Sequence, residues 1–188
     1  MGSHYGGLMA PPGEFGSPPD FVKGSALLEG AYEMAVGAHH GPRSRGGTRI
    51  DHPVAVARLL DEGEFPEVVV AAALLHDVIE DTDTELDEIE ARFGPEVADL
   101  VGEMTEDATI AAYRERKAEH RGRVARNSRV AAIYAADKLA KVRMMNERGE
   151  HPDGERLEHY RQTLVELRAA EPSLPFLPEL AAELEEIG

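Results

Sequence analysis

The chain has 188 residues, of which 42% are hydrophobic, and it carries a formal net charge of −16. This length suits one domain with a substantial core, and the hydrophobic content excludes a chain that stays disordered for lack of apolar side chains. The absence of cysteine excludes disulfides and thiolate chemistry, and the acidity disfavours binding to nucleic acid or to an anionic membrane.

The first 20 residues are rich in glycine and proline, which indicates a flexible tail. Its opening letters, MGSH, look like the remnant of an expression tag. We find no leader pattern there, and no apolar run long enough to span a bilayer. We therefore expect a cytoplasmic protein with a domain over residues 21–188.

Hydrophobic residues recur with helical spacing through nearly all of this domain, and no two-residue alternation indicates a strand. Gly, Pro, Ser or Asn bounds most of the segments. The expected helices cover residues 25–39, 52–62, 66–81, 84–93, 96–105, 110–126, 128–148, 153–170 and 176–187. The sequence thus predicts an all-α fold of about eight or nine helices around one core.

The third expected helix carries ionisable groups on its apolar side. Val69, Ala73, His76 and Glu80 share one stripe, and Asp77 lies beside His76. Burying such groups without partners costs several kcal/mol, on the order of the transfer cost of a charged group. One reading is a hydrogen-bonded core pair, which would be preferred for an isolated His-Asp dipeptide. The other is a pair of metal ligands.

A second buried carboxylate favours the metal. In the 128–148 helix, Asp137 is the only charge on an apolar stripe that also holds Val130, Ile133, Ala140 and Met144. His52 lies at the start of its own helix, just before Pro53. Two imidazoles and two carboxylates form a mixed nitrogen and oxygen site, which suits Mn, Fe, Zn, Co or Ni better than Ca or Mg.

Glu80 and Asp81 follow His76 and Asp77 by one helical turn. Either carboxylate could orient a water activated by the metal, or take its proton. The alternative is that both belong to an acidic, solvated helix end with Asp83 and Glu85.

Positive charge is concentrated in one part of this acidic chain. Eleven basic and four acidic residues lie between Arg114 and Arg148, a local excess of seven positive charges. Ordinary solvated helix faces would explain it, and so would a surface that binds a small polyanion.

Three strings together resemble the HD domain of alarmone hydrolases, which include the hydrolase halves of RelA/SpoT proteins and the stand-alone small alarmone hydrolases. The strings are HPVAVARLL, ALLHDVIEDTDTELDEIEARFGPEVADLV and YAADKLAKVRMM. The resemblance covers roughly Ala38 to Arg143. A lone HD dipeptide would be weak evidence for this family. The chain instead has an H, an HD, an ED and a D in the family's order, each with matching neighbours, and this combination is specific.

The resemblance implies removal of the 3′-pyrophosphate from ppGpp or pppGpp, with Mn²⁺ as the usual metal. It implies that Glu80 and Asp81 position and activate water, and that Arg43 or Arg45 packs on the base. It also implies four metal ligands: His52, His76, Asp77 and Asp137.

The chain departs from the family pattern around the nucleotide. Thr48 and Arg49 stand where Pro and Tyr are common, and Lys141 stands where an Asn often contacts the sugar. Lys141 could bind a phosphate directly. The helix before Asp137 offers further candidates for the distal phosphates: Arg114, Arg116 and Lys117.

Three functions stay open at this point. The first is alarmone hydrolysis, which releases pyrophosphate. The second is hydrolysis of another nucleotide with release of orthophosphate, and the third is a non-catalytic nucleotide-binding module. The expected partner in each case is a small nucleotide, and an exposed apolar helix face could pair two copies of the chain.

Overall fold

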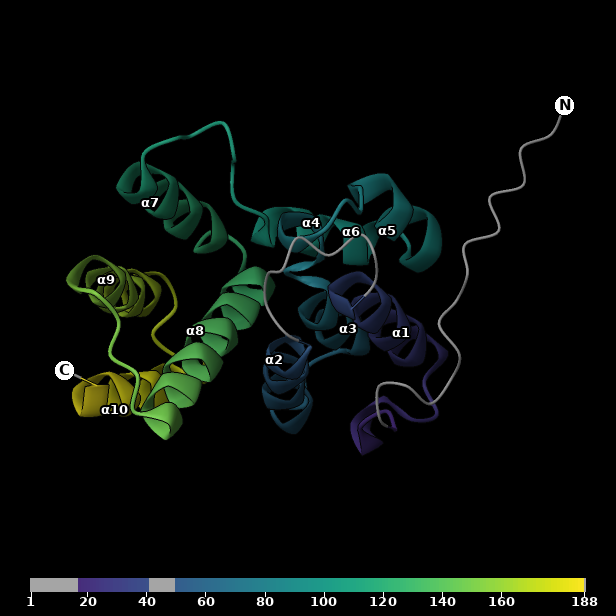
Figure 1. Cartoon of the computed structure of the whole chain (residues 1–188), viewed down its shortest axis with the longest axis horizontal. Coiled ribbons are helices and arrows are strands. Elements are labelled where there is room, and N and C mark those ends of the chain that lie inside the picture. Colours follow the sequence, from purple (N-terminus) through teal and green to yellow (C-terminus); the bar gives the residue numbers. More distant parts are fainter. Residues whose placement is uncertain (1–16, 41–49, 188) are drawn as a thin grey trace, which may run out of the picture.

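The computed structural model describes residues 17–40 and 50–187, and these residues form helices and connecting loops without a strand (Figure 1). The predicted all-α fold is confirmed. Most of the predicted N-terminal tail lies outside the described residues. Within them, no helix combines the length and the apolar character needed to cross a membrane.

The expected helical segments are all present, after a short 3-10 helix η1 at Asp20–Val22. In chain order the α-helices are α1 (Ala26–His40), α2 (Asp51–Glu62), α3 (Glu67–Leu75), α4 (Val78–Asp81), α5 (Leu86–Phe93), α6 (Pro95–Met104), α7 (Tyr113–Val124), α8 (Ser128–Arg148), α9 (Gly154–Ala170) and α10 (Leu177–Ile187).

The segment expected as one helix over 66–81 is divided into α3 and α4 by a turn at His76 and Asp77. In a continuous helix the carbonyl of Ala73 accepts from the backbone N–H of Asp77. Here that carbonyl accepts a hydrogen bond from the His76 imidazole at 2.7 Å. The division therefore falls at the two residues that carry the HD pattern.

Two helices organise the core. All residues of α3 from Val69 to Leu75 are at most 1% exposed, and this helix packs against α1, α2, α6 and α8. The 21-residue helix α8 runs between the α1–α6 layer and a second group made of α7, α9 and α10 (Figure 1). Because α8 contacts both groups, a side chain at its middle is enclosed from both sides.

Local sequence signals explain several helix ends. The helix expected from Thr84 begins at Leu86, because Glu85 forms a capping box with Glu88. Gly94 separates α5 from α6 with a φ of 87°, a conformation that favours glycine. Asn127 caps α8 by accepting from the backbone N–H of Arg129.

Candidate metal and catalytic site

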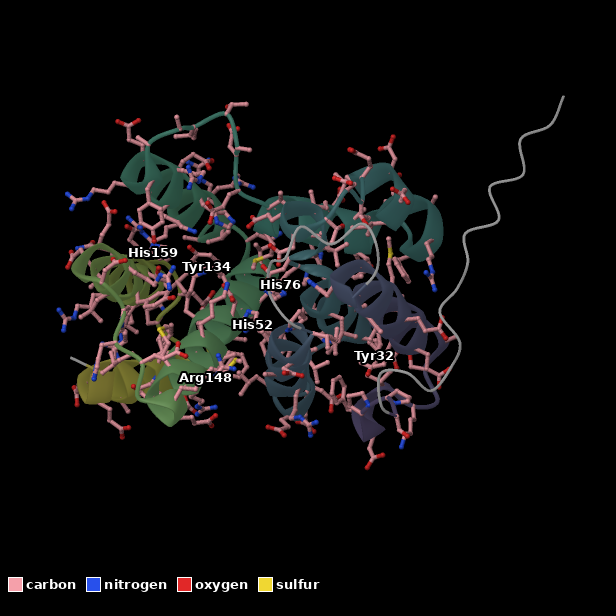
Figure 2. The ribbon with its side chains drawn as sticks, viewed as in Figure 1. Tyr32, His52, His76, Tyr134, Arg148 and His159 are labelled. Carbon is pink, nitrogen blue, oxygen red and sulfur yellow. The ribbon has the colours of Figure 1, made fainter. Side chains whose placement is uncertain are left out.

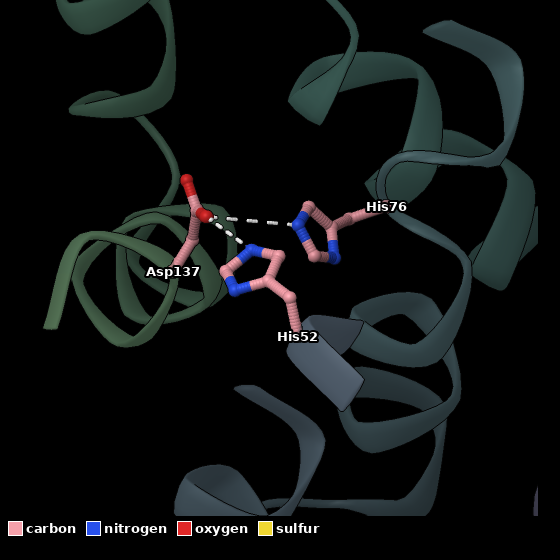
Figure 3. Close-up of side chains that lie close together, drawn as sticks. All are labelled: His52, His76 and Asp137. Carbon is pink, nitrogen blue, oxygen red and sulfur yellow. Dashed lines mark hydrogen bonds and ion pairs between the residues drawn. The ribbon is translucent and has the colours of Figure 1, made fainter. Parts of the chain in front are cut away.

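Three side chains from separate parts of the chain converge on one another (Figure 3). His52 comes from the first turn of α2, His76 from the turn after α3, and Asp137 from the middle of α8. Their ligand atoms all lie within 4.8 Å of one another. Oδ1 of Asp137 is 2.9 Å from Nε2 of His52 and 3.7 Å from Nε2 of His76.

Asp77, the fourth predicted ligand, lies alongside these three. Its Oδ1 is 3.2 Å from Nε2 of His76, and its Oδ2 is 3.8 Å from Nε2 of His52. His52, His76 and Asp137 are each 2% exposed, and Asp77 is 7% exposed. The structure therefore brings all four predicted ligands into one buried cluster.

The orientation of His76 is set by its own helix. A carbonyl can only accept, so the contact with Ala73 means that Nδ1 carries the hydrogen. Nε2 then points toward the two carboxylates, and it has no hydrogen-bond partner among the described residues. A backbone acceptor on the far nitrogen is the usual arrangement of a metal-binding histidine.

The charges of the cluster are strongly coupled. Burial disfavours the imidazolium of His76, but the carboxylates of Asp77 and Asp137 outweigh it and raise the pKa of His76 to about 10. Burial opposes ionisation of Asp77, but the neighbouring His76 and Lys141 hold the pKa of that carboxyl well below its usual range. For His52, burial dominates and lowers the pKa.

Two lysines of α8 bind the carboxylate of Asp137. Lys138 donates to Oδ2 at 2.5 Å, and Nζ of Lys141 is 3.0 Å from Oδ1. Burial opposes ionisation of Asp137, but these two ammonium groups keep its pKa well below the usual range. Lys141 thus occupies the same carboxylate oxygen that His52 contacts.

The cluster fits a divalent transition metal on the chemistry of its donors. Nε2 of His76 and Oδ2 of Asp77 are buried and have no hydrogen-bond partner among the described residues. Unpaired buried polar atoms are costly, and a cation between them would satisfy both. His52, His76, Asp77 and Asp137 are the residues that would hold it, with mixed nitrogen and oxygen ligands.

Glu80 and Asp81 lie on α4, directly after the turn. Glu80 is near the surface and accepts from the backbone N–H of Glu106 at 2.7 Å. Asp81 is partly buried, and its Oδ2 is 3.9 Å from Nδ1 of His39, whose side chain is 1% exposed. The Glu80 carboxylate is therefore fixed by a hydrogen bond from another part of the chain, and the Asp81 carboxylate lies close to a buried imidazole.

A cavity of about 380 Å³ opens beside the cluster. His52 forms its inner end, and residues of α7, α8 and α9 form its walls. Lys117 and Lys141, both predicted to bind substrate, line it together with Lys138. No carboxylate is among the described side chains that line this cavity, in a chain with sixteen excess negative charges.

The other predicted substrate-binding residues are placed differently. Neither Arg114 nor Arg116 lines the cavity. Arg114 pairs with Glu155 at 2.7 Å, and Arg116 binds Glu106 at 2.9 Å. Any contact of theirs with a substrate would require these ion pairs to open. Arg43 and Arg45 lie outside the described residues.

Sequence reasoning missed three residues at the site. Lys138 belongs to the basic stretch of the sequence, and its place directly after Asp137 does not indicate the contact that the two side chains make, because adjacent residues of a helix usually point apart. His39 lies in the last turn of α1, and Glu106 lies in the loop between α6 and α7. No spacing pattern indicates that Glu106 reaches Glu80 and also binds Lys117.

Comparison with known proteins places the chain in a family. A family model described as HD domain matches residues 31–165. The guanosine-3′,5′-bis(diphosphate) 3′-pyrophosphohydrolase MESH1 of Mus musculus is 42% identical over 126 residues, which cover 64% of this chain and 69% of that protein. A protein of Vibrio cholerae named guanosine-3′,5′-bis(diphosphate) 3′-pyrophosphohydrolase is 36% identical over 169 residues, which cover 86% of this chain and 23% of that protein.

Solved structures agree with this assignment. The structure of lmo0812 from Listeria monocytogenes matches with a TM-score of 0.66 and 35% identity, over 72% of this chain and 97% of that one. A metazoan ortholog of SpoT, described as hydrolyzing ppGpp, matches with a TM-score of 0.65 and 30% identity, over 92% of this chain and 96% of that one. The resemblance seen in the sequence is confirmed, and the chain belongs to the HD domain family.

Proposed function

We propose that this protein is a metal-dependent phosphohydrolase that removes the 3′-pyrophosphate from guanosine 3′,5′-bis(diphosphate) or its 5′-triphosphate form. One observation carries the proposal: a buried cluster of His52, His76 and Asp137 stands at the inner end of a cavity lined by cations and by no described carboxylate. The names of the relatives supply the substrate, since proteins 36–42% identical to this one are named for that activity.

The metal would be held by His52, His76, Asp77 and Asp137. We propose Mn²⁺ because it is the usual metal of the family that the sequence resembles, and the mixed nitrogen and oxygen ligands fit it among other divalent transition metals. A divalent ion bound there supplies a Lewis acid for the attack of water on a phosphoryl group. The backbone contact of His76 orients its imidazole, so that Nε2 would face an ion held between the two carboxylates.

Glu80 and Asp81 are proposed to orient the attacking water and to take its proton. Asp81 lies one turn after Asp77, and its backbone N–H donates to the Asp77 carbonyl at 2.9 Å. The backbone N–H of Glu106 fixes the Glu80 carboxylate, and the imidazole of His39 lies 3.9 Å from the Asp81 carboxylate. Two positioned carboxylates next to a metal cluster fit general base catalysis.

Lys117 and Lys141 are proposed to bind the phosphate oxygens. Both ammonium groups line the cavity, where a polyphosphate would replace part of their contact with Glu106 and Asp137. With Mn²⁺ bound to Asp137, the Lys141 ammonium would be free to turn toward the substrate.

A second candidate function is hydrolysis of another nucleotide with release of orthophosphate. Lys141 favours it, because a cation stands at the place where the family pattern has an Asn. We further propose a small-molecule partner, since a chain of net charge −16 disfavours nucleic acid. We also propose a cytoplasmic location, which fits a chain without cysteine.

Product identification tests these alternatives. The purified protein is incubated with Mn²⁺ and ppGpp, and separately with ordinary nucleotides. Release of pyrophosphate from ppGpp, abolished by a chelator, is the expected result. Release of orthophosphate from a different nucleotide would show that the proposed substrate is wrong, whereas the proposed metal site would stand. Binding of ppGpp without any turnover would instead indicate a non-catalytic module.

A further inference from the structure

The loop between α6 and α7 connects the two groups of helices that lie on either side of α8. Figure 2 shows His76 on one side of α8 and His159 on the other. Glu80 belongs to the group that holds His76, and Lys117 lies on α7 in the group that holds His159. Glu106, in the loop, contacts both Glu80 and Lys117. The loop therefore links the proposed water-activating carboxylate to the cavity.

Glu106 contacts the two sides through different groups. Its backbone N–H donates to Oε1 of Glu80 at 2.7 Å. Its carboxylate accepts from two cations of α7, with Oε1 bound by Lys117 and Oε2 bound by Nε of Arg116 at 2.9 Å. Burial opposes ionisation of Glu106, but Lys117 and Arg116 outweigh burial and lower the pKa of this carboxyl. The side chain is therefore a charged group that is held from two positions on α7.

The two cations that bind Glu106 differ in what else they contact. Lys117 lines the cavity, so an anion there could replace Glu106 as its partner. Arg116 does not line the cavity, and its Nη1 donates to the carbonyl of Ile110 at 2.9 Å. Arg116 thus joins two points of the loop, and the loop would have to open before this guanidinium could reach a substrate.

The peptide bond between Thr105 and Glu106 is held at its carbonyl end by Arg123. Nη2 of Arg123 donates to the Thr105 carbonyl at 2.8 Å, and Nη1 donates to the Glu103 carbonyl at 2.9 Å. The C=O and N–H groups of a planar trans peptide point in opposite directions. The contact that fixes the Thr105 carbonyl therefore also directs the Glu106 N–H, which is the group that donates to Glu80.

The two arginines occupy one face of α7. Arg123 follows Arg116 by seven residues, which is close to two helical turns, so both point to the same side of the helix. Tyr113 and Lys117, one turn apart, line the cavity, and neither arginine does. One face of α7 thus contributes to the cavity, and another face holds the loop.

We propose that Arg116 and Arg123 are positioning residues of the hydrolytic site, which clamp the α6–α7 loop so that the Glu106 N–H holds the Glu80 carboxylate in place. This inference rests on the proposed function, in which Glu80 orients the attacking water. Both arginines act through Glu80 and do not touch the substrate. The role of Arg116 is therefore different from the phosphate binding that the sequence indicated.

The first test is steady-state hydrolysis of ppGpp with Mn²⁺ by Arg116→Gln, Arg123→Gln and Lys117→Gln. Arg126→Gln is the matched control, because Arg126 is an exposed arginine just after α7 that does not line the cavity. Thermal melting identifies any variant that fails to fold. Arg123 also binds carbonyls at the end of α6, so Arg116→Gln carries the test alone if Arg123→Gln does not fold.

Each arginine variant should have a kcat lower by about tenfold or more, because small displacements of a catalytic group are costly, and a KM close to the wild-type value. Lys117→Gln should instead raise KM, and Arg126→Gln should behave as the wild type. A raised KM with unchanged kcat in Arg116→Gln would overturn the proposal, because that is the behaviour of a phosphate ligand. A wild-type kcat in the folded arginine variants would overturn it as well.

Hydrogen exchange of the Glu106 backbone N–H tests the clamp without turnover, by NMR on chelator-treated protein. Glu80→Ala, Arg116→Gln and Arg123→Gln should each accelerate this exchange on the order of tenfold, while amides in the middle of α8 keep their wild-type rates. Equal acceleration throughout the protein would indicate general destabilisation and overturn the proposal, as would unchanged exchange at Glu106. If ppGpp is not hydrolysed, the hydrolase proposal fails, and the exchange rates still decide whether the two arginines hold this N–H.

Discussion

Replacing Lys141 by methionine should make metal binding tighter. The Lys141 ammonium is 3.0 Å from Oδ1 of Asp137, an oxygen that a bound metal would also require. A metal ion must therefore displace this ammonium and then tolerate a positive charge nearby. Methionine keeps most of the length and volume of lysine without its charge, so both costs disappear in Lys141→Met.

The size of the effect follows from the geometry. Two unit charges at the distance of this pair attract by ~5 kcal/mol at an effective dielectric constant of about 20. The Lys141 side chain is 32% exposed, so solvent screening and side-chain freedom remove much of this. A net difference of about 1–2 kcal/mol remains, which corresponds to a dissociation constant for Mn²⁺ about five to thirty times lower.

The assay is a calorimetric titration of chelator-stripped protein with Mn²⁺. Arg143→Gln is the control, because it removes one positive charge from the same helix at a residue that binds Glu183 instead. Turnover should change in the opposite direction, since the loss of Lys141 from the cavity raises KM. Metal binding equal to or weaker than that of the wild type would refute the reasoning.

Further predictions concern the ligands, the proton balance and the supporting residues. His76→Ala should lose both metal and turnover, whereas Asp81→Ala should keep nearly stoichiometric metal without turnover. Metal analysis after dialysis and a product assay check both variants. Activity retained in either variant would show that the replaced residue does not have its proposed role. Because the pKa of His76 is raised to about 10, its imidazolium stabilises the metal-free protein fully below the unfolded value of about 6.5, and this contribution is lost as the pH rises toward 10. Urea midpoints of metal-free protein should accordingly fall over that range, and Mn²⁺ affinity should increase with pH, because binding releases this proton. His39→Phe should lower kcat on the order of tenfold while metal content is unchanged, since Nδ1 of His39 lies 3.9 Å from the carboxylate of Asp81 and His39 is not a predicted ligand. A normal kcat would make His39 a packing residue only.

Periodicity was sufficient to predict the helical segments, apart from the division of 66–81, and the inward direction of His76, Asp77 and Asp137, whereas Glu80 of the same stripe is exposed. Asp137 interrupts an apolar stripe, and the structure places it 2% exposed beside His52 and His76. Such an interruption can be interpreted from the sequence alone, because a buried charge needs a partner whichever elements the helix packs against. The turn at His76 was not predicted. The His76 imidazole bonds the Ala73 carbonyl there, and hydropathy does not indicate a side-chain contact of this kind.

The partners of the surface charges could not be read in the same way. Arg116 and Lys117 are neighbours in a basic run, yet only Lys117 lines the cavity, and both bind Glu106. Which cation faces the cavity depends on how α7 lies against α8 and α9, and hydrophobic spacing within one helix does not determine that angle. Buried Lys138 was hidden among exposed basic residues for the same reason.

The ammonium groups around Asp137 have a consequence for the order of assembly. In many small metalloproteins the ligands repel one another until the ion arrives, so the chain stays unfolded without it. Here Lys138, Lys141 and a protonated His76 already balance the carboxylates of Asp77 and Asp137. The newly synthesised chain can therefore complete its fold first and acquire the ion afterwards, and starvation for metal would leave an intact, dormant protein that is ready for reactivation.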